Sequence, residues 1–162
     1  MKANITLLQW GNEILWLIAS VVITTFMTWS IYPEIDKGFF FYISGTMFLA
    51  LNYLRWILFP RYSPIMFSFW FKMVMLLINI PLLMVIGKYF LSIMEIFDSF
   101  NFSYGYSESH LIRENAPLDF IQQVRTLTIA SVASFLVLTV IFEIRAVQLI
   151  FKWRQVPSAL LK

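Results

Sequence analysis

The sequence predicts an all-α integral membrane protein, a single domain over residues 1–162 with four transmembrane helices in an antiparallel bundle. Four long apolar runs cover residues 12–32, 39–58, 65–90 and 120–147. Each reaches the roughly 20 residues needed to cross about 30 Å of hydrocarbon. Backbone polar groups in lipid must be paired inside their own segment, so each run is predicted to be a helix. The composition agrees, because only 13% of the residues are charged, against about 25% in soluble domains.

The first run and the turn after it predict a helical hairpin. The run is longer than the roughly 7–15 apolar residues of a cleavable signal peptide, so we expect it to stay in the protein as a helix. Residues 33–38 follow it, opening with Pro33 and closing with Gly38. This polar turn is predicted to join the first two helices.

The next two connections differ in length. Pro60 and Pro64 bound a short turn between the second and third helices, and short links place sequential helices side by side. Residues 91–119 are predicted to form one long extracytoplasmic loop between helices 3 and 4. Loops of that length are usually functional or disordered. Near its end, Pro117 suits the first position of the fourth helix.

The charged residues sort by side if both termini are cytoplasmic. The inner side then holds eight basic residues: Lys2, Arg55, Arg61, Lys72, Arg145, Lys152, Arg154 and Lys162. The outer side holds four: Lys37, Lys88, Arg113 and Arg125. Seven acidic residues are outside (Glu34, Asp36, Glu95, Asp98, Glu108, Glu114 and Asp119) and two are inside (Glu13 and Glu143). The basic excess on the inner side is typical of cytoplasmic loops and predicts an N-in, C-in topology.

Polar residues within the spans form the first candidate site. The intramembrane cluster is predicted to contain Glu13, Asn52, Arg55, Lys72, Asn79 and Glu143. Its four charges sum to zero and fall at similar depth in the inner half of the membrane. Arg145 is only two residues from Glu143 and points elsewhere on a helix, so Glu143 is expected to pair with Arg55 or Lys72.

Three roles are open for this cluster. It can be an interhelical salt-bridge and hydrogen-bond network, a pair of basic side chains snorkelling to the headgroups, or a proton, ion or ligand pathway. Pro81 lies two residues after Asn79 and frees the carbonyl of Leu77, so a kink is predicted beside the cluster.

Alternating aromatic residues in the long loop form the second candidate site. The predicted partner-binding residues are Phe100, Phe102, Tyr104, Tyr106 and His110. A period of two suits an extended segment with one aromatic face. That face can lie along the outer headgroups, dock against a partner subunit or cover a pocket in the bundle.

Several kinds of chemistry have no support in the sequence. The chain has one histidine, no cysteine and five glycines, so thiolate metal sites, paired-histidine haem and glycine-rich phosphate loops are not predicted. No metal, cofactor or enzymatic activity is expected. The basic residues gather at membrane boundaries, so nucleic acid is not an expected partner.

The sequence favours a non-catalytic accessory or scaffolding subunit of a larger membrane complex. Such a subunit would contact membrane lipids and other membrane protein subunits through its helix faces and its aromatic loop. The alternative is a small carrier, or a lipid- or quinone-binding membrane protein, that uses the polar cluster. In either case we expect a multi-pass protein of a bacterial inner membrane or a plasma membrane.

Overall fold

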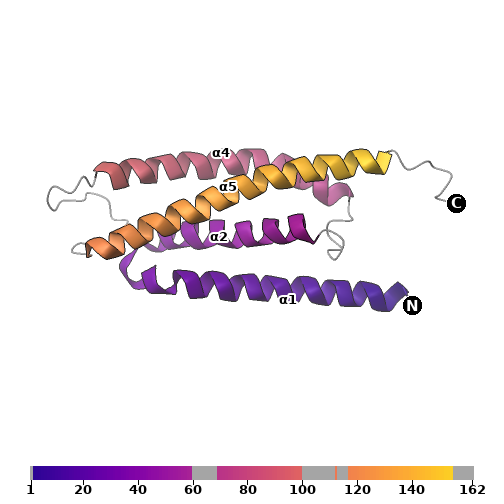
Figure 1. Cartoon of the computed structure of the whole chain (residues 1–162), viewed down its shortest axis with the longest axis horizontal. Coiled ribbons are helices and arrows are strands. Elements are labelled where there is room, and N and C mark those ends of the chain that lie inside the picture. The colour runs from indigo at the N-terminus through magenta and orange to yellow at the C-terminus, as the bar shows by residue number, and fades with distance from the viewer. Residues whose placement is uncertain (1, 60–68, 100–111, 113–116, 155–162) are drawn as a thin grey trace.

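The computed structural model describes residues 2–59, 69–99, 112 and 117–154, and these residues are almost entirely helical. The order is α1 (Lys2–Thr28), the 3₁₀-helix η1 (Trp29–Glu34), α2 (Lys37–Leu58), α4 (Phe69–Ser99) and α5 (Leu118–Arg154). The four long helices run lengthwise beside one another and alternate in direction (Figure 1). The start of α1 and the end of α5 therefore lie at the same end of the bundle.

Three of these helices are long and apolar enough to cross a membrane. The apolar stretches are Gln9–Tyr32, Phe69–Glu95 and Asp119–Phe151. α2 is not among them, because Asn52, Tyr53 and Arg55 interrupt its apolar run. All three of these side chains are buried.

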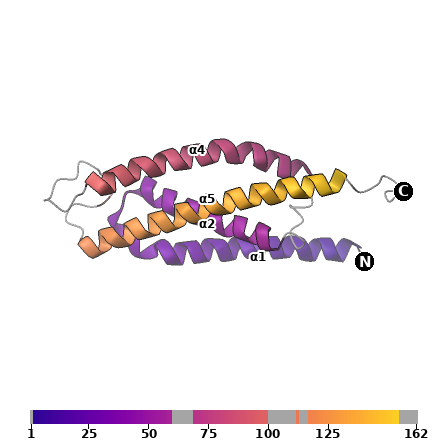
Figure 2. The same cartoon turned by 45° about the horizontal axis from the view of Figure 1, so that its top comes forward.

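α2 is the central helix of the bundle. It packs against α1 on one side and α5 on another, and α4 in turn packs against α5. Because its neighbours cover it, its polar side chains face other helices rather than the surroundings. α4 bows outward along its length (Figure 2) and contains Pro81 within one continuous helix, in agreement with the curvature that a missing backbone donor allows.

Large side chains bridge the space between α2 and α4. The Tyr42 hydroxyl donates to the Ile86 carbonyl at 3.0 Å, and the Tyr42 and Tyr89 rings meet edge to face at 4.7 Å. Farther along, the rings of Phe39 and Phe97 lie 6.3 Å apart. The two helices therefore contact each other through long side chains rather than through a close approach of their backbones.

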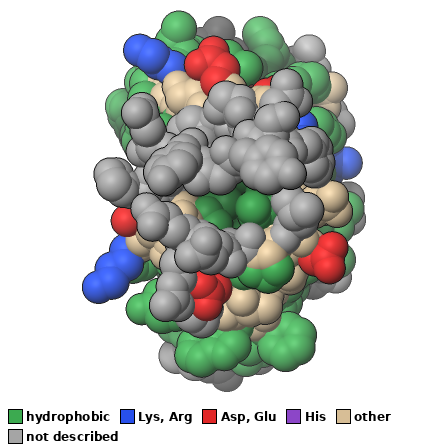
Figure 3. Space-filling model, turned by 90° about the vertical axis from the view of Figure 1, so that its left-hand side faces the viewer, with side chains coloured by type: hydrophobic (Ala, Val, Ile, Leu, Met, Phe, Trp, Pro, Cys, Tyr) green, Lys and Arg blue, Asp and Glu red, His purple; other side chains and the backbone are tan. Residues whose placement is uncertain are grey.

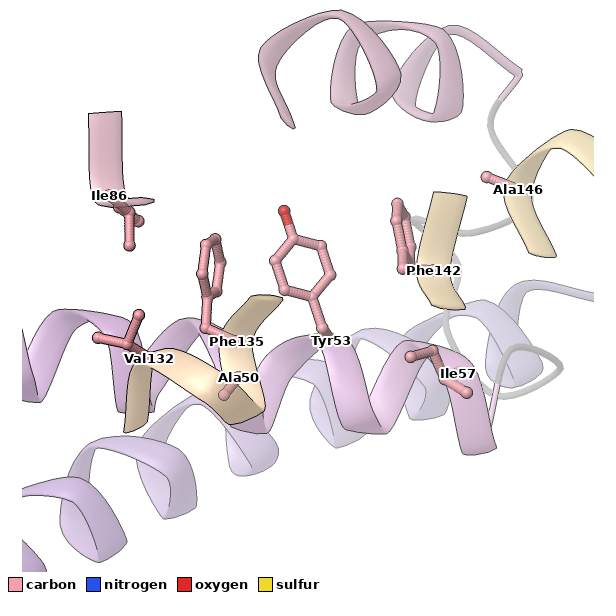
Figure 4. Packing of buried hydrophobic residues seen from close by; sticks show 8 residues of the cluster. All are labelled: Ala50, Tyr53, Ile57, Ile86, Val132, Phe135, Phe142 and Ala146. Atoms are coloured by element: carbon pink, nitrogen blue, oxygen red, sulfur yellow. The ribbon is translucent and has the colours of Figure 1, made fainter. Parts of the chain in front are cut away.

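Two apolar clusters hold the helices together. The first lies between α2, α4 and α5 and comprises Ala50, Tyr53, Ile57, Ile86, Val132, Phe135, Phe142 and Ala146 (Figure 4). The second lies toward the opposite end of the bundle and comprises Ile31, Ile35, Phe39, Ile43, Ile93, Phe97, Ile112 and Val124.

The loop predicted for residues 91–119 is shorter than expected at both ends. Residues 91–99 continue α4, and α5 begins at Leu118, directly after Pro117. The physical reason is packing: Ile93 and Phe97 lie one turn apart on α4 and are both buried in the second cluster. The predicted start of the third span, residues 65–68, lies outside the described residues.

The turn predicted for residues 33–38 is shorter in the structure, because η1 continues to Glu34 and α2 begins at Lys37 with Asp36 as its cap. Asp36 precedes α2, and its Oδ2 accepts from the backbone N–H of Gly38 at 2.7 Å and of Phe39 at 3.2 Å. Such a cap contributes about 0.5–2 kcal/mol to helix stability. A Cβ on Gly38 would lie 2.9 Å from that carboxylate oxygen, so glycine leaves room for the cap.

Charged side chains gather at this same end of the bundle. The exposed residues Asp36, Lys37, Glu95, Asp98 and Asp119 all come from helix ends that meet here. Figure 3 looks onto this end and shows acidic and basic side chains around its rim. One pair, Arg125 and Asp98 at 2.9 Å, joins α5 to α4.

Candidate functional site

The predicted polar cluster is divided between two interfaces of α2. Glu13 of α1 and Arg55 of α2 form an ion pair between Glu13 Oε2 and Arg55 Nη1, and each residue is only 3% exposed. The Arg55 guanidinium also lies over the Trp16 ring, 5.7 Å from its centroid. A cation over an indole face is attracted by the ring quadrupole. Arg55 is thus held from two sides by α1.

This ion pair leaves part of each charged group without a partner. Glu13 Oε1 and Arg55 Nη2 are buried and make no hydrogen bond, and the same is true of the Ser20 and Thr24 hydroxyls farther along α1. Asn52, one turn before Arg55, donates to the Phe48 carbonyl of its own helix at 2.8 Å. Among the described side chains, the Glu13–Arg55 pair is the charged contact between α1 and α2.

A second group, the central polar cluster, lies between α2, α4 and α5. It consists of Tyr53, Asn79 and Glu143, and the buried Lys72 lies seven residues before Asn79 on α4. The Tyr53 hydroxyl donates to Asn79 Oδ1, and the Glu143 carboxylate lies within electrostatic range of that hydroxyl. Figure 4 shows the Tyr53 oxygen pointing away from α2, with Phe135 and Phe142 of α5 on either side of the ring.

Burial in this cluster is deep, and several polar atoms have no partner. Asn79 is fully buried, Tyr53 is 1% exposed and Lys72 is 3% exposed, while Glu143 is half-buried. Asn79 Nδ2 and Glu143 Oε1 make no hydrogen bond, and neither does the nearby Trp56 Nε1. An unpaired polar group inside a protein costs about 1–3 kcal/mol.

The prediction that Arg55 pairs with Glu143 is wrong. Arg55 faces α1 and binds Glu13 instead. Among the described residues, Lys72 and Glu143 form no ion pair with each other or with any other group. Arg145, as expected, points away from Glu143, and its Nη1 donates to the Ile57 carbonyl near the end of α2.

Sequence reasoning missed the aromatic members of both sites. Trp16 and Trp56 both have buried indole nitrogens within the bundle, Trp16 beside Arg55 and Trp56 beside Tyr53. Tyr53 was not singled out at all. One signal was present: Tyr53 lies beside Asn52 and two residues before Arg55, on the one helix whose apolar run is interrupted.

The aromatic loop residues Phe100, Phe102, Tyr104, Tyr106 and His110 lie outside the described residues. Nearby, Ile112 forms an antiparallel bridge with Ile35 and is buried in the second apolar cluster. The chain therefore returns across the end of the bundle at Ile112 before α5 begins.

Metal ligands do not cluster in the part of the chain that the structure describes. The comparisons with known proteins give no relative: no protein family, curated protein or solved structure matches this chain. The geometry of the two polar sites and of the exposed helix faces is therefore the basis for inference.

Proposed function

We propose that this chain is a four-pass membrane protein with both termini on the cytoplasmic side, acting as a non-catalytic subunit of a larger membrane assembly. α2 supports the fourth pass because it runs alongside three helices able to cross a membrane (Figure 1). Its polar side chains are covered by α1 and α5, so lipid would not meet them. Charged residues around one end of the bundle fit the placement of that end outside the hydrocarbon.

The uncovered helix faces are the observation that carries the subunit assignment. Only 22% of the apolar window of α1 and 17% of that of α4 are buried within the chain. The end of α1 and the start of η1 also present an open apolar surface formed by Val21, Val22, Thr25, Phe26, Trp29 and Ser30. Ala130, Ala133 and Ser134 form an exposed face of small residues on α5. Small residues let membrane helices approach closely, and no helix in the described part of the chain covers that face.

Cysteine labelling tests the topology, because the chain has no native cysteine. Glu95→Cys, exposed near the end of α4, should react with a membrane-impermeant maleimide in intact cells. Gln148→Cys, exposed near the end of α5, should react only after permeabilisation. The reverse pattern would show the opposite orientation, and labelling of both sites from outside would show that an even number of passes, or none, lies between them.

Co-purification tests the subunit assignment. Extraction in a mild detergent should recover other polypeptides in fixed ratio with this chain. Ala130→Trp should reduce their yield at least about tenfold, because an indole on the small-residue face holds a partner helix away. Val85→Trp is the matched control, since Val85 is 67% exposed on α4. A solitary, monodisperse protein, or equal loss in both variants, would contradict the proposal.

A small carrier is the second candidate, and the central polar cluster favours it. Ionisable residues within membrane spans are costly and often mark ion or proton paths. Lys72 and Asn79 are buried and Glu143 is half-buried, and all three lie in helices that are long and apolar enough to cross a membrane.

A further inference from the structure

The face of α1 that is buried against α2 is polar. Among residues 9–28, the part of α1 whose side chains are described, the four buried residues are Glu13, Ser20, Thr24 and Thr28. Spacings of seven and four residues place them on one face of the helix. The ion pair between Glu13 and Arg55 turns this face toward α2. α1 therefore buries its polar residues and leaves its apolar residues on the outside of the bundle.

Five buried polar atoms on this interface have no hydrogen-bond partner among the described residues. They are Glu13 Oε1, Trp16 Nε1, Ser20 Oγ, Thr24 Oγ1 and Arg55 Nη2. The Trp16 ring belongs to the group because it lies against the Arg55 guanidinium. We call these five residues the α1–α2 seam. A buried polar atom without a partner is costly, so five of them along one interface indicate a ligand that can pair with them.

The hydroxyls of the seam differ from the other buried hydroxyls of the described helices. Those others each donate to a carbonyl about one turn earlier in their own helix, and they belong to Thr28, Thr46, Thr128, Ser131 and Thr139. Ser20 and Thr24 do not make this bond, although they are only 1% and 5% exposed. Their hydroxyls are therefore available to a ligand between α1 and α2.

The spacing of these groups suits a file of water molecules. Residues four apart lie about 6 Å apart along a helix, and one water bonded to both at about 2.8 Å spans nearly that distance. Room is present on α2, where a Cβ on the partly buried Gly45 would meet no atom within 4 Å. Gly45 lies ten residues before Arg55, and Thr24 lies eleven after Glu13, so in antiparallel helices the two are at about the same level (Figure 1).

The chemistry of the seam favours water over an ion. The N–H groups of Arg55 and Trp16 disfavour a bound cation, and the Glu13 carboxylate disfavours a bound anion. Water both donates and accepts, so it can also bond to the hydroxyls of Ser20 and Thr24. Buried water typically makes about three hydrogen bonds to polar groups of this kind.

We propose that the α1–α2 seam binds a file of water molecules within the membrane-spanning part of the bundle. These waters accept from Arg55 Nη2 and Trp16 Nε1, donate to Glu13 Oε1, and bond to the hydroxyls of Ser20 and Thr24. From Glu13 to Thr24 the file covers about 16 Å, against about 30 Å for the hydrocarbon core. The inference rests on the proposed membrane topology and is independent of the subunit assignment.

Thiol reactivity tests the seam, because methanethiosulfonates react with the thiolate, which forms in water and not in hydrocarbon. The chain has no native cysteine, so Ser20→Cys introduces a single thiol of similar size. The probe is methyl methanethiosulfonate, added to the full chain in phosphatidylcholine vesicles. Val22→Cys is the matched control, because Val22 lies at similar depth and is 60% exposed on the outside of α1. We expect Ser20→Cys to react at least about tenfold faster than the control.

The two ways in which this test can fail are distinguishable. Equally slow reactions would show that the interface is dry and would overturn the proposal while leaving the topology intact. Equally fast reactions would show that the outer face of α1 is not in lipid, so that the topology fails and the inference with it.

A second pair of variants keeps the test decisive if Ser20→Cys does not fold. Thr24→Val replaces a hydroxyl by a methyl group of similar size. In a hydrated seam it removes a hydrogen bond to water and lowers the denaturing-detergent fraction at the unfolding midpoint, whereas in a dry seam it removes an unpaired polar group and raises that midpoint. Thr25→Val is the matched control, because Thr25 is the next residue and is exposed. An unchanged or raised midpoint in Thr24→Val, or an equal fall in Thr25→Val, would overturn the proposal.

Discussion

Replacing Glu13 by alanine should lower the free energy of unfolding by about 3–5 kcal/mol, because it leaves the Arg55 charge buried without its counter-ion. Both residues are only 3% exposed, and Trp16 is the other described side chain holding the guanidinium. The measurement is equilibrium unfolding in mixed micelles, followed by circular dichroism. This loss would be a large fraction of the unfolding free energy of an ordinary domain, which is about 5–15 kcal/mol.

Two further variants separate the lost ion pair from other effects of the substitution. Glu95→Ala removes an exposed carboxylate near the end of α4 and should change the unfolding free energy by less than about 0.5 kcal/mol. The double variant Glu13→Met with Arg55→Met removes both charges and should recover most of the loss, because a well-packed apolar pair often replaces a buried ion pair without cost. Equal losses for Glu13→Ala and Glu95→Ala would show that the ion pair does not hold α1 to α2.

Tyr53→Ala should destabilise the bundle by about 3–5 kcal/mol, the usual range for removing a large buried aromatic side chain. The Tyr53 ring lies 5.0 Å from that of Phe142 and 5.7 Å from those of Phe135 and Trp56. Its removal opens a cavity where α2, α4 and α5 meet. The same unfolding measurement applies.

Tyr53→Phe isolates the hydrogen bond from the packing. It keeps the ring but leaves Asn79 Oδ1 without its donor, so the expected loss is about 1–3 kcal/mol. Phe41→Ala is the control for aromatic truncation, because Phe41 is 70% exposed on the same helix. We expect little change there. A loss in Tyr53→Phe as large as in Tyr53→Ala would place the energy in the Tyr53–Asn79 bond rather than in the aromatic packing.

These expectations link stability to the proposed roles. The Glu13–Arg55 pair and the central polar cluster lie on different sides of α2, so loss of one should leave the other intact. The two sites are therefore separable by experiment.

The sequence predicted the helices and the turn at residues 33–38 because these depend on local properties. A long apolar run can be recognised in the sequence without knowing what its helix packs against. In the same way, Asp36 caps α2 through backbone atoms only two and three residues away. It also predicted that Glu13, Arg55, Lys72, Asn79 and Glu143 are polar groups within helical segments. Their membrane topology and their functional roles stay predictions.

The tertiary structure decided which of these residues meet. Helix rotation and crossing place Arg55 against α1, so that it binds Glu13, while Glu143 on α5 has no counter-ion among the described residues. Packing also extended α4 through Ile93 and Phe97, where a loop was expected. The physical reason is range: hydropathy and capping act within a few residues, whereas the partner of a buried side chain depends on how whole helices pack.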